Sequence, residues 1–362
     1  MKKLLIILFL LPVVLGAIPP REVEPDTTRS LTIYPAMFYS DEMGFGGGAM
    51  AIFLHRPPGR TEHYPSNSVF LSAIYTSHKQ FASSLRPSVQ LFEARWMLSG
   101  EFKYVYWPDS FFGLGNDTSL DDEERFTTET TVIELNLLRR FGRYWGVEML
   151  SRWRQWSLHE RETDGALLNG EIPGASGARI LGLGLSAVFD DRDNEMNPHR
   201  GGKIEIQCHV YNEALGSDFA WTKYKLDAFR FYRLGEHSVL GFQALGVYND
   251  GEPPFLEMAS PGCEMRGIST LRYLGRHMAL GRVELRTYPF SGKILSRMGF
   301  AVFAETGRVA NEIDQFALRG MRYSVGGGLR FMLVPSERLT LRLDVGFSAD
   351  ESGFTITSAE AF

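Results

Sequence analysis

The sequence predicts an all-β protein, a single antiparallel transmembrane β-barrel of about sixteen strands. Three observations carry this prediction. Many segments alternate apolar and polar residues, and aromatic residues cluster near segment ends. Beyond the N-terminal leader, no run approaches the ~20 uninterrupted apolar residues that a spanning helix needs. If the chain crosses a membrane, it does so with strands.

The N-terminus has the layout of a secretory signal peptide. Lys2 and Lys3 precede an apolar run from Leu4 to Leu15, which the small residues Gly16 and Ala17 follow. We therefore expect residues 1–17 to be a signal peptide. Residues 18–30 carry prolines and charges without a period, so we expect a short periplasmic tail there. Residues 31–362 are expected to form the barrel.

Alternation is clearest in three segments, namely Lys203–Val210, Arg282–Arg286 and Leu341–Phe347. Successive side chains of a strand point to opposite faces. Lys203, Glu205, Gln207 and His209 should therefore share a face opposite Ile204, Ile206 and Cys208. A row this polar would be costly against lipid, so we expect it to line a wet lumen.

Alternating runs bounded by Gly, Pro, Asn or Asp number about sixteen, an even count that puts both termini in the periplasm. The expected strands include Leu31–Asp41, Gly44–Arg56, Val132–Phe141, Lys203–Glu213, Met278–Pro289 and Gly353–Phe362.

Composition agrees with strands that are apolar on one face, since 44% of the residues are hydrophobic and 37 are glycine. A net charge of −5 without a basic block excludes nucleic acid as a partner. Cys208 and Cys263 are the only cysteines, so the chain can form one disulfide at most and no framework of several disulfides. The acidic run Asp117–Glu124 matches no EF-hand spacing, so we expect a solvated loop and no metal site.

Enzymatic functions find little support in the sequence. It contains no Gly-x-Ser-x-Gly elbow, His-Glu-x-x-His motif, P-loop or dinucleotide fingerprint. An outer-membrane phospholipase needs a serine and a histidine on the lipid-facing side, and His209 falls on the polar face. We expect a protein that is not an enzyme and that binds no cofactor.

Several motifs follow one another between Asp190 and the C-terminus. Met265, Arg266, Gly267 and Ile268 lie in a long loop between two alternating strands. A turn with Asp191, Arg192, Asp193, Pro198 and Gly201 comes earlier, and a strand with Phe303, Glu305 and Gly307 comes later. In this order they resemble the motifs of the BamA/TamA outer-membrane superfamily, also called the bacterial surface antigen family. Ile268 and Glu305 depart from it, because the family usually has an aromatic residue and an aspartate there.

The resemblance implies that the loop folds into the lumen, with Arg266 as its anchor. The planar guanidinium suits bidentate pairing with a carboxylate, and both Glu305 and Asp344 fall on polar strand faces, so either could receive it. Gly267 would let the backbone pass close to the wall. The terminal Phe362 resembles the aromatic residue with which outer-membrane barrels signal to their assembly machinery.

The resemblance also implies a bacterial outer-membrane location, contact with lipid and lipopolysaccharide, and a role in outer-membrane protein insertion, assembly or polypeptide translocation. In this family the activity is attributed to a weak seam between the first and last strands. Family members usually carry POTRA repeats that receive clients, whereas residues 18–30 are too short for one. A separate periplasmic or POTRA-bearing subunit would then deliver unfolded barrel clients. The alternative is a plugged solute pore or structural envelope barrel without insertase activity.

Overall fold

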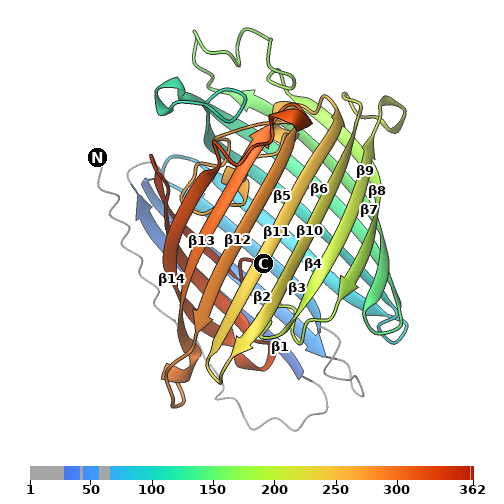
Figure 1. Ribbon diagram of the computed structural model, residues 1–362, viewed down its shortest axis with the longest axis vertical. Coiled ribbons are helices and arrows are strands. Elements are labelled where there is room, and N and C mark those ends of the chain that lie inside the picture. Colours follow the sequence, from blue (N-terminus) through green and yellow to red (C-terminus); the bar gives the residue numbers. More distant parts are fainter. Residues whose placement is uncertain (1–27, 41–43, 57–65, 359) are drawn as a thin grey trace.

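The computed structural model describes residues 28–40, 44–56, 66–358 and 360–362. Sixteen strands form one antiparallel sheet, and each pairs with its neighbour in sequence from β1 to β16. The sheet curls into a tilted barrel (Figure 1). The predicted fold class is confirmed. The expected signal peptide, residues 1–17, and most of the expected tail lie outside the described residues.

The strands vary in length from 7 to 18 residues, and many are long enough to cross a bilayer while tilted. They are β1 (Thr28–Ser40), β2 (Gly44–Arg56), β3 (Asn67–Thr76), β4 (Phe81–Leu91), β5 (Trp96–Phe111), β6 (Glu124–Phe141), β7 (Trp145–His159), β8 (Ala178–Asp190), β9 (Gly201–Tyr211), β10 (Trp221–Leu234), β11 (Ser238–Gly251), β12 (His277–Thr287), β13 (Met298–Ala310), β14 (Arg322–Val334), β15 (Leu339–Phe347) and β16 (Ser352–Ser358).

The two faces of the sheet differ as predicted from the alternation. In β9, Ile204 and Ile206 are exposed on the outside, whereas Glu205 between them is buried. In β14, Tyr323 and Val325 are exposed and Ser324 is buried. Large apolar side chains that are exposed in this way recur around the barrel, which is the pattern required of a lipid-facing surface.

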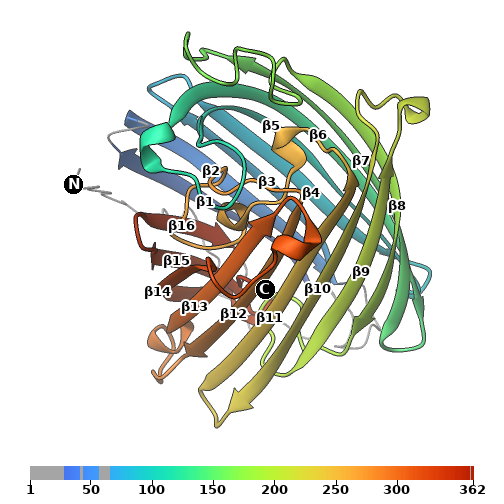
Figure 2. The same cartoon turned by 45° about the horizontal axis from the view of Figure 1, so that its top comes forward.

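Strand boundaries agree with the predicted ones to within a few residues at most places. The barrel begins at Thr28 rather than at residue 31, and β6 begins at Glu124 rather than at Val132. The C-terminal boundary was wrong for a different reason. Strand β16 ends at Ser358, and the described residues Glu360–Phe362 turn inward, so that the C-terminus lies inside the barrel (Figures 1 and 2).

The first and last strands, β1 and β16, are the two edges of the sheet and border what is called the seam here. Among the described residues, no backbone ladder joins β1 to β16, although every other neighbouring pair is joined by one. Strand β16 has 7 residues and β1 has 13. No helix in the described part of the chain is long and apolar enough to cross a membrane.

The connections at the two ends of the barrel differ. The end that carries the β5–β6, β7–β8 and β11–β12 connections is called the loop end here, and the end where β1 begins and β16 stops is the terminal end. Inside the loop end lies an apolar core that includes Phe111, Trp156, Leu167, Trp221 and Phe255. Side chains of the β7–β8 and β11–β12 connections pack there against side chains of the strands, in agreement with the predicted loop in the lumen.

The terminal half of the lumen carries many charged side chains beside a small apolar cluster of Ile52, Leu54 and Leu339. It holds a cavity of about 450 Å³ that is lined by side chains including Arg140, Glu148, Arg192, Lys203 and Glu337. The barrel is thus divided along its axis into an apolar plug and a polar chamber.

Candidate functional site

The β11–β12 connection, residues 252–276, folds into the barrel and crosses the lumen (Figure 2). Two short 3-10 turns, η3 (Phe255–Glu257) and η4 (Pro261–Cys263), shape it. The Ser260 hydroxyl lies 2.7 Å from the carbonyl oxygen of Thr270 and 2.9 Å from that of Arg272. Bridging hydrogen bonds between Ala259 and Gly275 close its base. The loop therefore has a defined conformation that its own hydrogen bonds hold.

Arg266 is the centre of the site, and it contacts carboxylates of three strands. Its Nη2 lies 2.7 Å from Glu305 Oε1 on β13, and its Nη1 lies 2.9 Å from Asp344 Oδ2 on β15. These are the two partners expected from the sequence, and the structure brings both to Arg266. The same Nη1 lies 2.6 Å from Glu284 Oε2 on β12, a partner that sequence reasoning missed although its strand and face were recognised.

The contacts of Arg266 extend beyond these ion pairs. Its backbone N–H donates to Glu305 Oε2 at 2.7 Å, and its Nε donates to Glu305 Oε1 at 2.9 Å. The guanidinium carbon lies 3.3 Å from the ring centroid of Phe303. Ser324 donates its hydroxyl hydrogen to the Arg266 carbonyl. The side chain and the backbone of Arg266 are thus both bonded to the barrel wall, so these contacts fix the loop as well as the guanidinium.

Burial alone would lower the pKa of Arg266, because it disfavours the charged form. Glu284, Glu305 and Asp344 outweigh burial and raise the pKa above its ordinary value. The arginine therefore stays charged at every physiological pH, and the anchor is permanent rather than titratable.

Gly267 lies against the wall, as its position in the motif predicted. Its φ is +82°, and an added Cβ atom would lie 2.4 Å from the carbonyl group of Gly346 on β15. Gly346 is equally constrained, since its own Cβ would lie 2.5 Å from the Arg266 carbonyl group. The two backbones touch only because both residues lack a side chain. On either side of the Arg-Gly pair, Met265 and Ile268 are buried in an apolar cluster with Leu280 and Val309.

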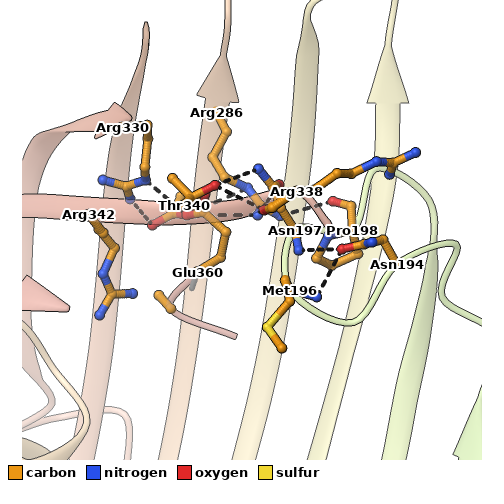
Figure 3. A network of polar contacts seen from close by, with 12 residues as sticks. Asn194, Met196, Asn197, Pro198, Arg286, Arg330, Arg338, Thr340, Arg342 and Glu360 are labelled. Carbon is orange, nitrogen blue, oxygen red and sulfur yellow. Dashed lines mark hydrogen bonds and ion pairs between the residues drawn. The ribbon is translucent and has the colours of Figure 1, made fainter. Parts of the chain in front are cut away.

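A wider network of buried charges surrounds the anchor on the barrel wall. Arg330 Nη1 lies 2.5 Å from Asp344 Oδ1, and its Nε lies 2.9 Å from Glu360 Oε2 in the C-terminal tail. Arg286 and Arg342 lie close by, 3.7 Å from Glu284 and 3.2 Å from Asp344. Figure 3 shows Glu360 among these arginines. Charges that would be costly alone are compensated here by several partners each.

A second anchor holds the loop to another part of the wall. The buried Glu257 Oε1 lies 2.8 Å from Arg154 Nη1 and 3.2 Å from Arg152 Nη2 on β7, and its Oε2 lies 4.0 Å from Lys223 Nζ on β10. Burial alone would raise the pKa of Glu257, but Arg152, Arg154 and Lys223 lower it to about 2. The loop thus presents a cation to acidic residues of β12, β13 and β15 and an anion to basic residues of β7 and β10. Nothing in the sequence indicated a role for Glu257, because Arg152 and Arg154 lie more than a hundred residues upstream and Lys223 lies on another strand.

The aspartate-arginine-aspartate turn lies at the terminal end, between β8 and β9. Asp191 accepts a hydrogen bond from Gly202 N at 2.7 Å, and Asp193 accepts one from His199 N at 2.9 Å. Gly201 has a φ of +87°, and its added Cβ would collide with the Asp191 carbonyl oxygen at 2.2 Å. Arg192 pairs with Asp190 at 2.6 Å. These contacts shape the turn, and each uses a residue that the sequence analysis singled out.

The same turn reaches the other wall of the lumen (Figure 3). Arg286 donates to Asn197 Oδ1 at 3.0 Å and to the Pro198 carbonyl at 3.3 Å, and Asn197 donates to Thr340 Oγ1 at 3.2 Å. The Met196 carbonyl accepts a hydrogen bond from Glu360 N at 3.3 Å. The turn therefore joins β8 and β9 to β12, β15 and the C-terminal tail. Sequence analysis missed Asn197, which belongs to no alternating segment, and Glu360, which it placed within the last strand.

Phe362 lies apart from the end of a strand. Its ring stacks on Phe231 with centroids 5.6 Å apart, and the Arg282 guanidinium carbon lies 5.6 Å from its centroid. The expectation that it ends the last strand is wrong, because the tail bends inward after Ser358 to reach Arg330 and Phe231. Its role as an assembly signal stays a prediction.

Comparisons with known proteins agree with this geometry. The model of the Omp85 superfamily domain matches residues 67–354. A solved structure of BamA from Haemophilus ducreyi lacking POTRA domains 1–3 is similar, with a TM-score of 0.55 and 13% identity over 92% of this chain and 70% of that chain. CdiB from Acinetobacter baumannii has a TM-score of 0.51 and 10% identity over 93% of this chain and 60% of that chain. At such identities these likenesses show the fold alone, and no curated protein matches the sequence.

The family match covers most of the barrel, including the turn, the loop and the strands that carry the partners of Arg266. The predicted resemblance to the BamA/TamA type of barrel is confirmed. The chain belongs to the Omp85 superfamily.

Proposed function

We propose that this protein acts on polypeptides at the bacterial outer membrane, in the insertion or assembly of outer-membrane proteins or in polypeptide translocation. The observation that carries the proposal is the seam. Strands β1 and β16 have no backbone ladder between them in the described residues. Unpaired strand edges present backbone donors and acceptors to other strands, and a client strand can add to such an edge.

The placement in the membrane follows from the same barrel. An even number of strands puts both ends of the sheet on one side, which we assign to the periplasm. The loop end then faces outward, where acidic residues such as Asp117, Asp121 and Glu171 are exposed. Acidic loops suit a surface on which divalent cations bridge lipopolysaccharide.

The plugged lumen supports a route along the seam rather than through the centre. The loop is anchored to two parts of the wall by Arg266 and Glu257, and an apolar core fills the loop end. A client that passed through the centre would have to break both anchors, whereas a client that paired at the seam would break neither. The proposal involves no chemical step and no cofactor.

Depletion of the protein tests this function. Every other outer-membrane barrel is quantified by mass spectrometry of isolated membranes after depletion, with and without a plasmid copy of the wild type. A general loss of barrels that the wild-type copy restores supports insertion or assembly. Loss of a single companion supports dedicated translocation. An unchanged set of proteins contradicts both roles.

A plugged solute pore or structural barrel is the second candidate, and the polar chamber of about 450 Å³ favours it. Conductance of planar bilayers separates the two candidates. The wild type and a variant without residues 255–273 are compared at equal protein amounts. A wild type that already conducts freely favours the pore, whereas conduction only after loop removal favours a barrel that is closed at rest.

The proposal also includes a separate periplasmic or POTRA-bearing subunit that delivers clients. Crosslinking in intact cells followed by purification of the barrel identifies it. Residues of the terminal end, such as Glu236 and Lys293, are suitable sites for a photoreactive side chain because both are exposed. The exposed outer loops provide the matched negative control, since a periplasmic partner cannot reach them.

A further inference from the structure

A groove of about 290 Å³ lies on the outer face of β8–β11. Most of its lining residues belong to the outward rows of these strands, and Lys203, Phe229 and Gln243 of the inward rows complete the lining. The small residues Gly202, Ala228 and Ala244 form its floor. The large apolar residues Phe189, Ile204 and Phe242 form its sides.

The register of the strands explains the shape of the groove. Ala228 lies opposite Ile204 on one neighbouring strand and opposite Ala244 on the other. Ala244 in turn lies opposite Gly281 on β12. Small residues thus follow one another across adjacent strands, on a face where most other positions carry large apolar side chains. The result is a shallow trough in an otherwise apolar belt.

A charged side chain lies at one end of this trough. Arg230 pairs with Gly202 and Phe242 in the ladder, one outward position closer to the terminal end than Ala228. Its Nη1 lies 3.0 Å from both carboxylate oxygens of Asp191, and its side chain stays 50% exposed. In the described part of the chain, its Nε and Nη2 make no hydrogen bond. Two donor groups of Arg230 therefore remain without a hydrogen-bond partner among the described residues.

Exposed aromatic residues lie near Arg230, toward the terminal end of the barrel. Tyr232, the next outward residue of β10, is exposed and meets the Phe242 ring edge-on at 6.2 Å. On the other side of the groove, Trp145 is exposed and meets Phe189 at 4.9 Å. Exposed aromatic residues gather at the level of lipid headgroups. Arg230 thus lies where headgroups begin, and the trough runs from there toward the middle of the membrane.

We propose that this groove binds one glycerophospholipid of the periplasmic leaflet, with its phosphate on Arg230 and an acyl chain along Gly202, Ala228 and Ala244. Guanidinium groups bind phosphate oxygens through charge-assisted hydrogen bonds. A lipid-facing arginine near the interface costs little, and an anionic partner offsets that cost. The inference rests on the proposed outer-membrane placement, which puts the terminal end against the phospholipid leaflet and the loop end against lipopolysaccharide.

Native mass spectrometry of the detergent-solubilised, folded protein tests the inference. The probe is phosphatidylglycerol, and the competitor is diacylglycerol with the same chains and no phosphate. We expect the wild type to retain one phosphatidylglycerol at a collision energy that removes all others, and to release diacylglycerol. Arg230→Gln should lower the retained fraction about tenfold or more, as loss of one charge-assisted hydrogen bond does. Ala244→Phe, which fills the trough, should lower it as strongly.

Matched controls separate this site from general lipid contact. Arg200→Gln removes an exposed charge from the adjacent β8–β9 turn, and Ala73→Phe adds a ring to the lipid-facing side of β3. Both should retain the lipid as the wild type does. Equal loss in controls and site variants, or equal retention of diacylglycerol by the wild type, would overturn the proposal.

The wild-type competition needs no variant to fold, so the test stays decisive if a substitution disturbs the barrel. Its failure is also distinct from failure of the proposed function. A barrel that folds in bilayers and restores the depleted strain, yet retains no phospholipid, contradicts only this site. A barrel that holds the lipid but leaves the set of outer-membrane proteins unchanged contradicts only the proposed function.

Discussion

Arg266→Ala is the substitution whose effect follows most directly from the structure. It removes the shared partner of Glu284, Glu305 and Asp344, all of which are buried. Breaking a buried ion pair by removing one side costs about 3–5 kcal/mol. Asp344 keeps Arg330 at 2.5 Å and Arg342 at 3.2 Å, and Glu284 keeps Arg330 at 3.4 Å. Both of these carboxylates therefore stay compensated.

Glu305 sets the size of the effect, because its next cation is Arg282 at 3.9 Å. One orphaned carboxylate rather than three points to the lower part of that range, about 3 kcal/mol. Replacing this carboxylate as well should relieve part of the cost. We expect the double variant Arg266→Ala, Glu305→Gln to be more stable than Arg266→Ala alone by about 1–2 kcal/mol.

Urea unfolding in detergent micelles measures this effect, followed by tryptophan fluorescence and by heat-modifiable migration in gels. Trp156 and Trp221 lie in the apolar core beside the loop, so their emission reports its packing. Arg276→Ala is the matched control, since Arg276 belongs to the same loop and pairs with an exposed Glu312 at 3.3 Å. Such surface pairs contribute about 0–1 kcal/mol. If Arg266→Ala costs no more than this control, or if the double variant is the least stable of all, the assignment of the anchor is wrong.

Three further predictions concern the loop and the tail. Gly267→Ala should destabilise the barrel more than Gly292→Ala, because both positions have positive φ but only Gly267 would place a Cβ against the wall; unfolding in urea compares them. Glu257, whose pKa is lowered to about 2, should hold its end of the loop above pH about 4.5 and lose it as the pH falls toward 2; protease cleavage of the loop should rise in this window for the wild type, whereas Glu257→Gln should be cleaved readily at neutral pH. Phe362→Ala should lower the melting temperature of the assembled barrel, since its ring packs on Phe231; an unchanged melting temperature with less assembled protein would instead point to a role in assembly alone.

Much of the barrel was predictable because the two faces of each strand lie in different environments, with lipid outside and the lumen inside. A period of two fixes which side chains share a face, and this alone predicts Glu305 and Asp344 inside the lumen. It also placed Cys208 with Ile204 and Ile206 on the lipid-facing side. Periodicity fails at strand ends, and β6 was predicted too short because Glu124–Thr131 carries few apolar residues.

The rest of the site depends on which side chains of different strands lie next to one another. The alternation of apolar and polar residues within one strand does not contain that information. Glu284 was assigned to the right face, yet its contact with Arg266 follows from the β12–β13 register and from the depth of the loop. Glu257 and Asn197 lie in connections without any period, so their partners across the lumen had no signal in the sequence. The inward tail was missed for a different reason, because the alternation of the last strand was extended to Phe362, whereas β16 ends at Ser358.

The connectivity of the charged network has a kinetic consequence. Arg266 and Asp344 are 78 residues apart in sequence, and the network also includes Glu360, almost the last residue of the chain. Contacts between residues far apart in sequence form late, because the entropy cost of closing a long loop must be met before the contact energy is gained. A partly inserted barrel would therefore keep its lumen loop open to proteases until the final strands are in place. Pulse-labelled cells treated with protease at short intervals should show loop protection as the last step, so that the plug itself marks a finished barrel.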